Sequence, residues 1–472
     1  MLTAMSFLMT SCASKKPIQP NIIVLLCDDA GYADFGFNGS KDLQTPHIDA
    51  LARSGMIFTD AHVSASVSGP SRAGIMTGRY QQRFGYECNP SAAFSGVDLQ
   101  ETTLGDAMKA AGYHTSAFGK WHLGSEDPYK PNNRGFDYFY GFLSGGRGYF
   151  TNPKNDREGD DHCLRENDQF VSFEGYLTDR LADKAVDYIK ANKRHPFFMY
   201  WAPNAVHTPM QATEADLARF EGHKRQTLAA MTYALDRGVG QIIQTLKDEG
   251  LYDNTLIFFL SDNGGSPENT SCCYPLKGFK GNKYEGGHRV PFIVSWPKHI
   301  ASGSSFHGLV SSLDIFSTSL ATATAQLPEE KITPSIKDIT AQLDGIDLMP
   351  YMMNEKSGDP HQSLFWRKGE AAAARIGDMK LIRVARLGER MYNLQDDLSE
   401  TTDLSTTDST DLRQLNDALD RWESHMRAPL WTEGHTWDTI TWMIHEDLFL
   451  NREVRVKSPG QLHRFLKMHT KK

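Results

Sequence analysis

The chain lacks any long hydrophobic run. It has 472 residues, of which 40% are hydrophobic, but no apolar stretch reaches the ~20 residues that a membrane-spanning helix needs. Long apolar runs such as residues 22–27 and 256–260 have the length of strands. An excess of basic residues is also missing, since 50 Lys and Arg stand against 58 Asp and Glu, for a net charge of −8. We therefore expect neither a membrane-spanning helix nor nucleic acid as a main partner.

Cysteine is scarce, and its spacing contains no CxxC pair. The missing pattern argues against a structural zinc site. Cys272 and Cys273 are neighbours, so they form either a rare vicinal disulfide or two reduced thiols. The rest of the composition, with 11% aromatic and 23% charged residues and no internal repeat, is that of an ordinary globular protein. It excludes a disordered chain, a collagen-like repeat and a small disulfide scaffold.

The first 19 residues have two interpretations. Residues 1–11 are mostly apolar or small and lead to Cys12, as in a bacterial lipoprotein export signal whose cysteine carries the lipid. This interpretation predicts an exported protein that is periplasmic or anchored to a membrane through Cys12. The segment has no Lys or Arg before its short hydrophobic part, however, so a disordered tail or a misassigned start is the alternative.

Apolar strands alternate with helical segments over residues 20–360. Residues 22–26 form a continuous apolar run, which is typical of a strand buried on both faces of a parallel sheet. Further strands are expected at 56–59, 114–118, 197–201, 256–260 and 290–296, and helices at 45–52, 104–111, 176–192 and 224–249, the first of them N-capped by Thr45. The alternation predicts a doubly wound α/β domain with a large, mostly parallel sheet between helices.

The pattern changes after about residue 360. Short strands separated by turns are expected at 364–366, 372–376, 379–384 and 390–393, followed by a helix at 411–426. We interpret residues 361–472 as a C-terminal subdomain with a small antiparallel sheet and a helix. Residues 332–342 resemble a surface insertion. Residues 429–472, which carry Trp431, Trp437 and Trp442, indicate no particular element.

Polar pairs follow two of the expected strands. Asp28 and Asp29 come directly after the first apolar run, and Asp262 and Asn263 follow the strand at 256–260. Ligand sites in open α/β sheets form beyond the carboxyl ends of strands, and adjacent carboxylates repel each other unless a cation lies between them. Carboxylate and amide oxygens suit Ca²⁺ or Mg²⁺ better than zinc. The alternative is that these residues only form turns and helix caps.

A segment of small residues with one proline lies at 68–79. Ser68, Pro70 and Arg72 precede a helix-like run that ends in the tripeptide TGR at 77–79. This pattern predicts a strained loop that delivers a side chain to a helix N-terminus, where anions bind. From composition alone, a Ser/Gly surface loop is the stronger interpretation.

The same segment resembles the signature of the formylglycine-dependent sulfatases, a branch of the alkaline phosphatase superfamily. That signature has Cys or Ser, then Pro and Arg at alternate positions, usually followed by Thr-Gly-Arg, and residues 68–79 match it in full. Blocks at 21–36, 119–124, 261–265 and 281–291 resemble other parts of the family in the same order, so the resemblance runs from residue 20 to about 426. It implies an alkaline phosphatase-like fold and the hydrolysis of sulfate esters.

The resemblance implies that Ser68 is oxidised to formylglycine. The hydrated aldehyde is a gem-diol, one of whose hydroxyls attacks sulfur while the other later expels sulfate. Because Ser stands where many members have Cys, the implied partner is a maturation enzyme of the anaerobic radical type, in an anaerobic-competent bacterium. The implied metal ligands are Asp28, Asp29, Asp262, Asn263 and residue 68, around Ca²⁺ in most of the family, with Mg²⁺ as the alternative.

The resemblance also implies roles for five cationic side chains. Arg72 braces the gem-diol. Lys120 and His122, two residues apart on one face of an extended segment, hold a sulfate oxygen and accept the gem-diol proton, respectively. His207 contacts sulfate and acts as the acid for the leaving group, and Lys280 contacts sulfate.

The leading hypothesis is therefore a sulfatase that cleaves the S–O bond of a sulfated carbohydrate. One alternative is a phosphodiester or phosphonate monoester hydrolase of the same superfamily, and another is a non-catalytic sugar-binding relative. The presence of the whole residue set favours the sulfatase, while the sugar, the sulfated position and exo or endo action stay open. Lys277 and Lys283 are expected to be solvated. Candidate residues for the pocket wall are Arg134, Arg147, Tyr149 and His288.

Overall fold

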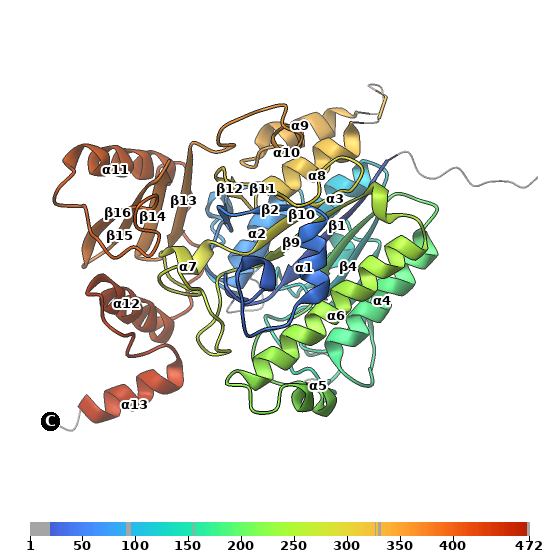
Figure 1. Cartoon of the computed structure of the whole chain (residues 1–472), viewed down its shortest axis with the longest axis horizontal. Coiled ribbons are helices and arrows are strands. Elements are labelled where there is room, and N and C mark those ends of the chain that lie inside the picture. The colour runs from blue at the N-terminus through green and yellow to red at the C-terminus, as the bar shows by residue number, and fades with distance from the viewer. Residues whose placement is uncertain (1–18, 91–95, 154–155, 326, 329–331, 470–472) are drawn as a thin grey trace, which may run out of the picture.

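The computed structural model describes residues 19–90, 96–153, 156–325, 327–328 and 332–469. In this part of the chain, a large sheet lies between helices, and a smaller sheet with its own helices lies to one side of it (Figure 1). The large sheet has ten strands in the order β11-β2-β10-β9-β1-β8-β4-β5-β6-β7. The export segment predicted at 1–19, including Cys12, lies outside the described residues except for Gln19.

The centre of the large sheet is parallel and buried. β1 (Asn21–Cys27) lies between β9 (Thr255–Ser261) and β8 (Phe197–Ala202), and every residue of these strands is buried, as their apolar sequences predict. β10 (Phe292–Ser295) is antiparallel to both of its neighbours, so the sheet is mixed. The other strands of this sheet are β4 (His114–Lys120), β5 (Tyr138–Phe142), β2 (Met56–Phe58), β11 (Ser304–Phe306), β6 (Arg165–Glu166) and β7 (Gln169–Phe170), and β3 (Ala61–His62) pairs separately with β12 (Val310–Ser311).

Helices cover both faces of the sheet, as the alternate residues of β1 show. Ile23 and Leu25 pack against one group of helices, whereas Ile22, Val24 and Leu26 pack against the other. The first group is α1 (Pro46–Arg53), α4 (Leu177–Asn192), α5 (Glu214–Arg219) and α6 (Gln226–Asp248), and the second is α2 (Ser68–Thr77), α3 (Leu104–Ala110), α8 (Asp314–Thr324), α9 (Pro334–Gln342) and α10 (Met349–Met352). This arrangement confirms the predicted fold class.

The prediction that Thr45 caps α1 is correct in position, but no side-chain capping bond forms. Thr45 occupies the N-cap position, but its side chain makes no capping hydrogen bond. The Thr45 hydroxyl instead accepts from the backbone N–H of Gly36 at 3.0 Å and donates to Asp49 Oδ1 at 3.1 Å. Two backbone N–H groups in the first turn, those of His47 and Ile48, donate to the carboxylate of Asp236 on α6. A tertiary contact therefore replaces the local cap.

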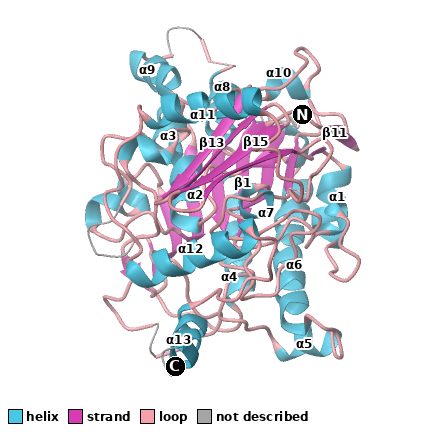
Figure 2. Cartoon of the chain, turned by 90° about the vertical axis from the view of Figure 1, so that its left-hand side faces the viewer, coloured by secondary structure: helices cyan, strands magenta, loops and turns pink. Residues whose placement is uncertain are grey.

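The small sheet is an antiparallel meander of four strands with helices on both faces. The helix α11 (Ser409–Glu423) packs on one face through Leu419, and α12 (His435–Phe449) packs on the other through Ile440. Figure 2 shows α12 in front of the large sheet, beside the short helix α7 (Glu285–His288). The sheet comprises β13 (Ser363–Lys368), β14 (Ala371–Ile376), β15 (Met379–Val384) and β16 (Gly388–Asn393), and α13 (Pro459–His469) follows α12. The sequence predicted this sheet and α11, but no element was predicted for the residues that form α12 and α13.

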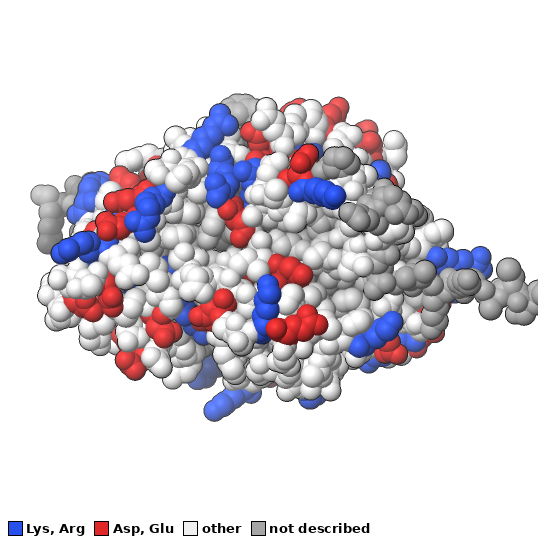
Figure 3. Space-filling model, turned by 90° about the horizontal axis from the view of Figure 1, so that it is seen from above, with Lys and Arg blue, Asp and Glu red and all other residues white. Residues whose placement is uncertain are grey.

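Three further predictions concern residues that the structure describes. Cys272 and Cys273 are both free thiols. Among the described residues, no helix has the length and apolar character that crossing a membrane requires. The segment expected as a surface insertion contains α9, whose Ile336 is buried in the core while most of the helix is exposed. The face seen in Figure 3 carries acidic and basic side chains intermingled.

Candidate active site

The two polar pairs meet at the carboxyl end of the sheet. β1 and β9 are parallel, with Cys27 opposite Ser261, so the residues that follow these strands lie side by side. The backbone N–H of Asp29 donates to Asp262 Oδ1 at 3.2 Å, and Asn263 Nδ2 donates to Asp29 Oδ1 at 2.8 Å. All of these side chains are buried. The sheet register thus brings together the residues that the sequence placed after two separate strands.

Ser68 faces this cluster from the first residue of α2. Its hydroxyl oxygen lies 3.2 Å from Asp28 Oδ1 and 3.1 Å from Asn263 Oδ1, and it donates to one or the other. The prediction of a strained loop before the helix is wrong, because the motif itself forms the helix. The small residues allow close packing here: a Cβ at Gly74 would lie 2.2 Å from Ser64 Oγ.

Three side-chain cations balance the three carboxylates. Arg72 donates through Nε to Asp262 Oδ2 at 3.0 Å, Lys120 donates to Asp28 Oδ2 at 2.7 Å, and Lys280 donates to Asp29 Oδ2 at 2.8 Å. Burial alone would raise the pKa of Asp28, but the positive charges of Lys120, His207 and Arg72 hold it below its ordinary value. The pKa of Asp29 is lowered in the same way, mainly by Lys280. Both groups are therefore anionic.

The donor set fits a hard divalent cation. The Oγ of Ser68 and one oxygen each of Asp28 and Asn263 converge within hydrogen-bonding distance. Oxygens of Asp28 and Asp29 lie within 4.8 Å of each other and of a ring nitrogen of His207. Carboxylate, amide and hydroxyl oxygens are the ligands that Ca²⁺ accepts in an all-protein site. The residues present therefore suit Ca²⁺ or Mg²⁺ far better than zinc.

The two histidines of the site differ in their surroundings. His122 is buried, and its Nδ1 has no hydrogen-bond partner among the residues that the structure describes. Burial, together with the charges of Lys120 and Arg72, holds the pKa of His122 well below its usual range. The extended segment expected to carry both Lys120 and His122 ends at Lys120, because His122 adopts a left-handed backbone conformation with φ near 60°.

His207 follows β8 and has a fixed ring orientation. Its Nδ1 donates to the Thr208 carbonyl at 2.6 Å, so Nε2 is the nitrogen that faces the cluster, 3.7 Å from Asp29 Oδ2. The hydroxyl of Tyr149 donates to the His207 carbonyl at 2.8 Å and so supports this loop from below. The proton that His207 gains or loses is therefore carried on Nε2.

The four residues expected in the pocket wall do not line the cavity beside this cluster. Arg134 donates to the backbone carbonyls of Val97 and Glu101, and Arg147 donates to a carbonyl and pairs with Asp156. Tyr149 is buried beneath the His207 loop. His288 belongs to another buried cluster, described below. These predictions are wrong because each side chain has structural partners within the protein.

The expectation that Lys283 is solvated is also wrong. Lys283 is 1% exposed, and its ammonium lies 3.4 Å from Ser66 Oγ. Burial and the nearby charge of Lys368 lower its pKa to about 7. The ammonium of Lys277 donates hydrogen bonds to the Glu400 carbonyl and to Asn451 Oδ1.

A cavity of about 390 Å³ opens beside Lys280 and His207. Helix α12 contributes to its lining through Trp437, Ile440 and Ile444. The sequence analysis missed these residues, although the apolar spacing of Ile440, Met443, Ile444 and Leu448 is that of an amphipathic helix. The other residues that line the cavity are Val67, Asn89, Pro90, Ser266, Pro267, Glu268, Phe279, Gly281, Lys368, Glu433, Thr441 and Lys457.

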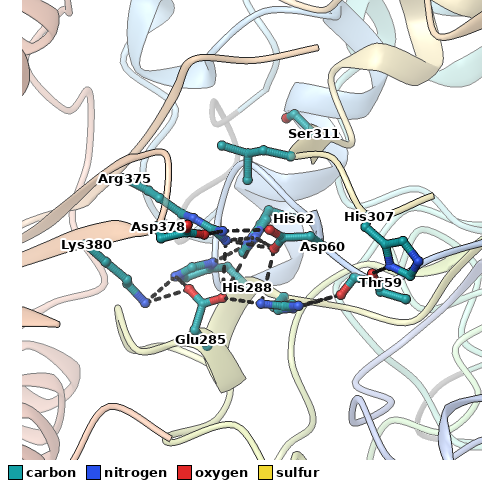
Figure 4. Close-up of polar contacts among 12 residues, drawn as sticks. Thr59, Asp60, His62, Glu285, His288, His307, Ser311, Arg375, Asp378 and Lys380 are labelled. Atoms are coloured by element: carbon teal, nitrogen blue, oxygen red, sulfur yellow. Dashed lines mark hydrogen bonds and ion pairs between the residues drawn. The ribbon is translucent and has the colours of Figure 1, made fainter. Parts of the chain in front are cut away.

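A second polar cluster lies between α7 and the small sheet (Figure 4). The nitrogens of His62 and His288 lie 3.0 Å apart, and Glu285 completes a group whose ligand atoms lie within 4.8 Å of one another. Lys380 contacts Glu285 at 2.9 Å and Glu400 at 2.8 Å. The carboxylates of the cluster are Asp60, Glu285 and Glu400, and its cations are Arg289, Arg375 and Lys380. Charges of both signs balance here, so we assign the cluster to holding the two sheets together rather than to a metal.

Comparison with known proteins relates the site to one family. The Sulfatase family model matches residues 20–325. The chain is 33% identical over 407 residues to the uncharacterized sulfatase YdeN of Escherichia coli K12, covering 74% of this chain and 68% of that protein. It is 32% identical over 391 residues to human N-acetylgalactosamine-6-sulfatase, covering 78% and 72%. The crystal structure of Ps i-CgsB in complex with k-i-k-neocarrahexaose superposes with a TM-score of 0.81 at 38% identity, over 90% of this chain and 97% of that one.

Proposed function

We propose that this chain, which belongs to the sulfatase family and is a sulfuric ester hydrolase, removes sulfate from a sulfated carbohydrate. The proposed means is formylglycine formed from Ser68. Two relatives support the substrate class, since one is named for N-acetylgalactosamine 6-sulfate and another was solved with a neocarrahexaose. The observation that carries the proposal is the position of Ser68. It begins α2, and its oxygen meets those of Asp28 and Asn263 among buried cations.

The residues of this chain divide the work around residue 68. A bound divalent cation supplies Lewis acidity, which polarises a sulfate oxygen and favours ionisation of the attacking hydroxyl. Asp28, Asp29, Asp262 and Asn263 hold that cation, and Arg72 braces residue 68. Because a sulfate ester is anionic, the ammonium groups of the two lysines, Lys120 and Lys280, serve as its binding partners.

The two histidines handle protons at opposite stages. His122, which is neutral in the free protein, accepts the proton of the hydrated aldehyde when sulfate is expelled. His207 donates from Nε2 to the oxygen of the leaving sugar, since its Nδ1 is committed to the Thr208 carbonyl. A sugar alkoxide is a poor leaving group, so this protonation matters for a carbohydrate substrate.

Maturation of Ser68 gives the first test. In a host with an anaerobic Ser-type maturase, we expect the peptide that contains residue 68 to lose two hydrogens, ~2 Da, and the protein to release sulfate from carrageenan oligosaccharides or N-acetylgalactosamine 6-sulfate over many turnovers. Without the maturase, the folded protein should stall after at most one turnover, because a serine sulfate ester needs a separate hydrolysis step. Intact mass, peptide mass and sulfate release measure these outcomes.

Two variants control for the maturation state. Ser68→Cys should gain activity over the parent in a host that matures only Cys-type motifs, whereas Ser68→Ala should be inactive in every host. Many turnovers by a Ser68 protein of unmodified mass would instead identify an ordinary serine nucleophile. Faster hydrolysis of bis(4-nitrophenyl) phosphate than of 4-nitrophenyl sulfate would favour the phosphodiesterase alternative.

The role of His207 predicts a dependence on the leaving group. His207→Ala should slow the hydrolysis of a sugar sulfate by ~10²-fold or more, the usual contribution of a general acid, but slow 4-nitrophenyl sulfate far less, because nitrophenolate leaves without protonation. His223→Ala is the matched control. The side chains of His207 and His223 are both 21% exposed, and the Nε2 of each lies 3.7 Å from an aspartate oxygen. Equal losses on both substrates would show that His207 is not the acid.

A further inference from the structure

We propose that the cavity between Lys280 and α12 holds the sugar ring that bears the scissile sulfate, with Trp437 as the apolar surface under the ring and the Lys368–Glu433 ion pair as the group that binds its hydroxyls. This inference rests on the proposed function and extends it to the choice of substrate. It assigns substrate selection to helix α12, which lines the same cavity as the proposed sulfate-binding groups.

The cavity has the size and position of a small-molecule site. Its volume of about 390 Å³ lies within the range of ligand pockets. Lys280 and His207, to which the proposed function assigns contacts with the sulfate, line this cavity together with Trp437, Ile440 and Ile444 of α12. A ligand whose sulfate is held by Lys280 and His207 therefore shares the cavity with α12.

Trp437 has the exposure expected of a binding surface. It is 38% exposed, whereas Trp121, Trp201 and Trp366 are each 1% exposed. An exposed indole beside a catalytic site is an apolar group left free to pack against a ligand. Together with Ile440, it gives the cavity one apolar side, which matches the face of a sugar ring that presents C–H groups.

A fixed ion pair supplies polar groups to the same cavity. Lys368 Nζ contacts Glu433 Oε2 at 2.6 Å, and the two side chains are only 9% and 10% exposed. Glu433 Oε1 accepts from the backbone N–H of Asn89 at 3.3 Å, and Asn89 Oδ1 accepts from the N–H of Gly69 at 2.9 Å. These hydrogen bonds connect the ion pair to Gly69, the residue after Ser68. The donors and acceptors of the pair are therefore held at a fixed position relative to residue 68.

The balance of charge favours a ring that is uncharged apart from its sulfate. Lys280 and Lys368, which line the cavity, each have a carboxylate partner. Lys457 and Glu268 add one charge of each sign to the lining. The cavity combines the apolar groups of α12, an ion pair that can bind hydroxyls and, at Lys280, a cation for the sulfate. This combination fits a sulfated sugar better than a peptide or a plain aryl ester.

The test compares sugar and aryl substrates in matured protein. The probes are N-acetylgalactosamine 6-sulfate, ι-carrageenan oligosaccharides and 4-nitrophenyl sulfate. We expect Trp437→Ala to lower kcat/KM for the better sugar substrate at least tenfold more than for 4-nitrophenyl sulfate. Glu433→Gln should act in the same direction, because the aryl ester has no hydroxyls. Trp437→Phe, which keeps an aromatic surface, should recover most of the loss.

Leu450→Ala is the matched control, since Leu450 is an exposed apolar residue at the other end of α12 and outside the cavity lining. It should leave the ratio of sugar to aryl activity unchanged. The inference is overturned if Trp437→Ala and Glu433→Gln lower both activities by the same factor, or if the parent hydrolyses the aryl sulfate but neither sugar sulfate. Absence of turnover on all three sulfate esters by matured parent would contradict the proposed function instead.

Discussion

Replacing Asp262 with alanine is expected to abolish multiple-turnover hydrolysis and, with it, the stabilisation of the protein by Ca²⁺. Asp262 accepts from Arg72 at 3.0 Å and from the backbone N–H of Asp29 at 3.2 Å. Its loss leaves the cation with fewer anionic ligands and leaves Arg72 without its principal partner. A loss of several kcal/mol of transition-state stabilisation corresponds to a decrease in kcat of ~10³-fold or more.

A readout that does not involve turnover separates metal binding from catalysis. Ca²⁺ that binds only the folded protein raises the melting temperature by an amount that grows with the logarithm of the ratio of its concentration to its dissociation constant, so the parent should show a shift that Asp262→Ala lacks. Asp236→Asn is the control, since Asp236 is equally buried but, within the described part of the chain, accepts only from the N–H groups of His47 and Ile48. Parent-like metal content in Asp262→Ala would mean that the ligand assignment is wrong. Repeating the titration with Mg²⁺ identifies which ion binds more tightly.

The sequence predicted that Asp28 and Asp29 would meet Asp262 and Asn263, because this geometry follows from local rules. Two apolar runs of strand length each end in a polar pair, and neighbouring parallel strands deliver such pairs to the same edge. The observed register, with Cys27 opposite Ser261, places the pairs together with no further assumption. The short alternating strands of the C-terminal meander were predictable for a similar reason, since each pairs with the next along the chain.

The cavity wall could not be predicted because its contacts join distant parts of the chain. Glu433 meets Asn89 across 344 residues, and no local pattern indicates such a partner. Lys283 shows the same limit: its neighbours in sequence suggest a solvated charge, yet the backbone N–H of Lys283 contacts His445 of α12, and the ammonium is buried. Arg134 was misassigned because backbone carbonyls, which every sequence supplies, satisfy its guanidinium.

Two buried glutamates, Glu285 and Glu400, share one buried lysine, and Glu285 also pairs with Arg289 at 3.3 Å. Lys380, on β15, contacts Glu285 at 2.9 Å and Glu400 at 2.8 Å, and all three side chains are 0% exposed. Glu400 also accepts from the backbone N–H of Glu285 at 2.7 Å, at the start of α7. The carbonyl of Gly287 in α7 accepts from the backbone N–H of Gly264, next to the proposed ligand Asn263. The cluster therefore connects the small sheet to the loop that carries two of the proposed metal ligands.

Lys380→Met is expected to lower the free energy of unfolding by about 3 to 5 kcal/mol, because removing Lys380 leaves the buried Glu400 without the cation that pairs with it among the described residues. Urea unfolding followed by fluorescence measures the change. Lys193→Met is the matched control: its ion pair with Glu249 is as short, at 2.7 Å, but the lysine side chain is 46% exposed, so a loss below about 1 kcal/mol is expected. Similar losses in the two variants would show that the cluster contributes no more than a surface ion pair. A loss confined to Lys380→Met, together with a weaker Ca²⁺ shift, would show that the small sheet stabilises the metal-binding loop through α7.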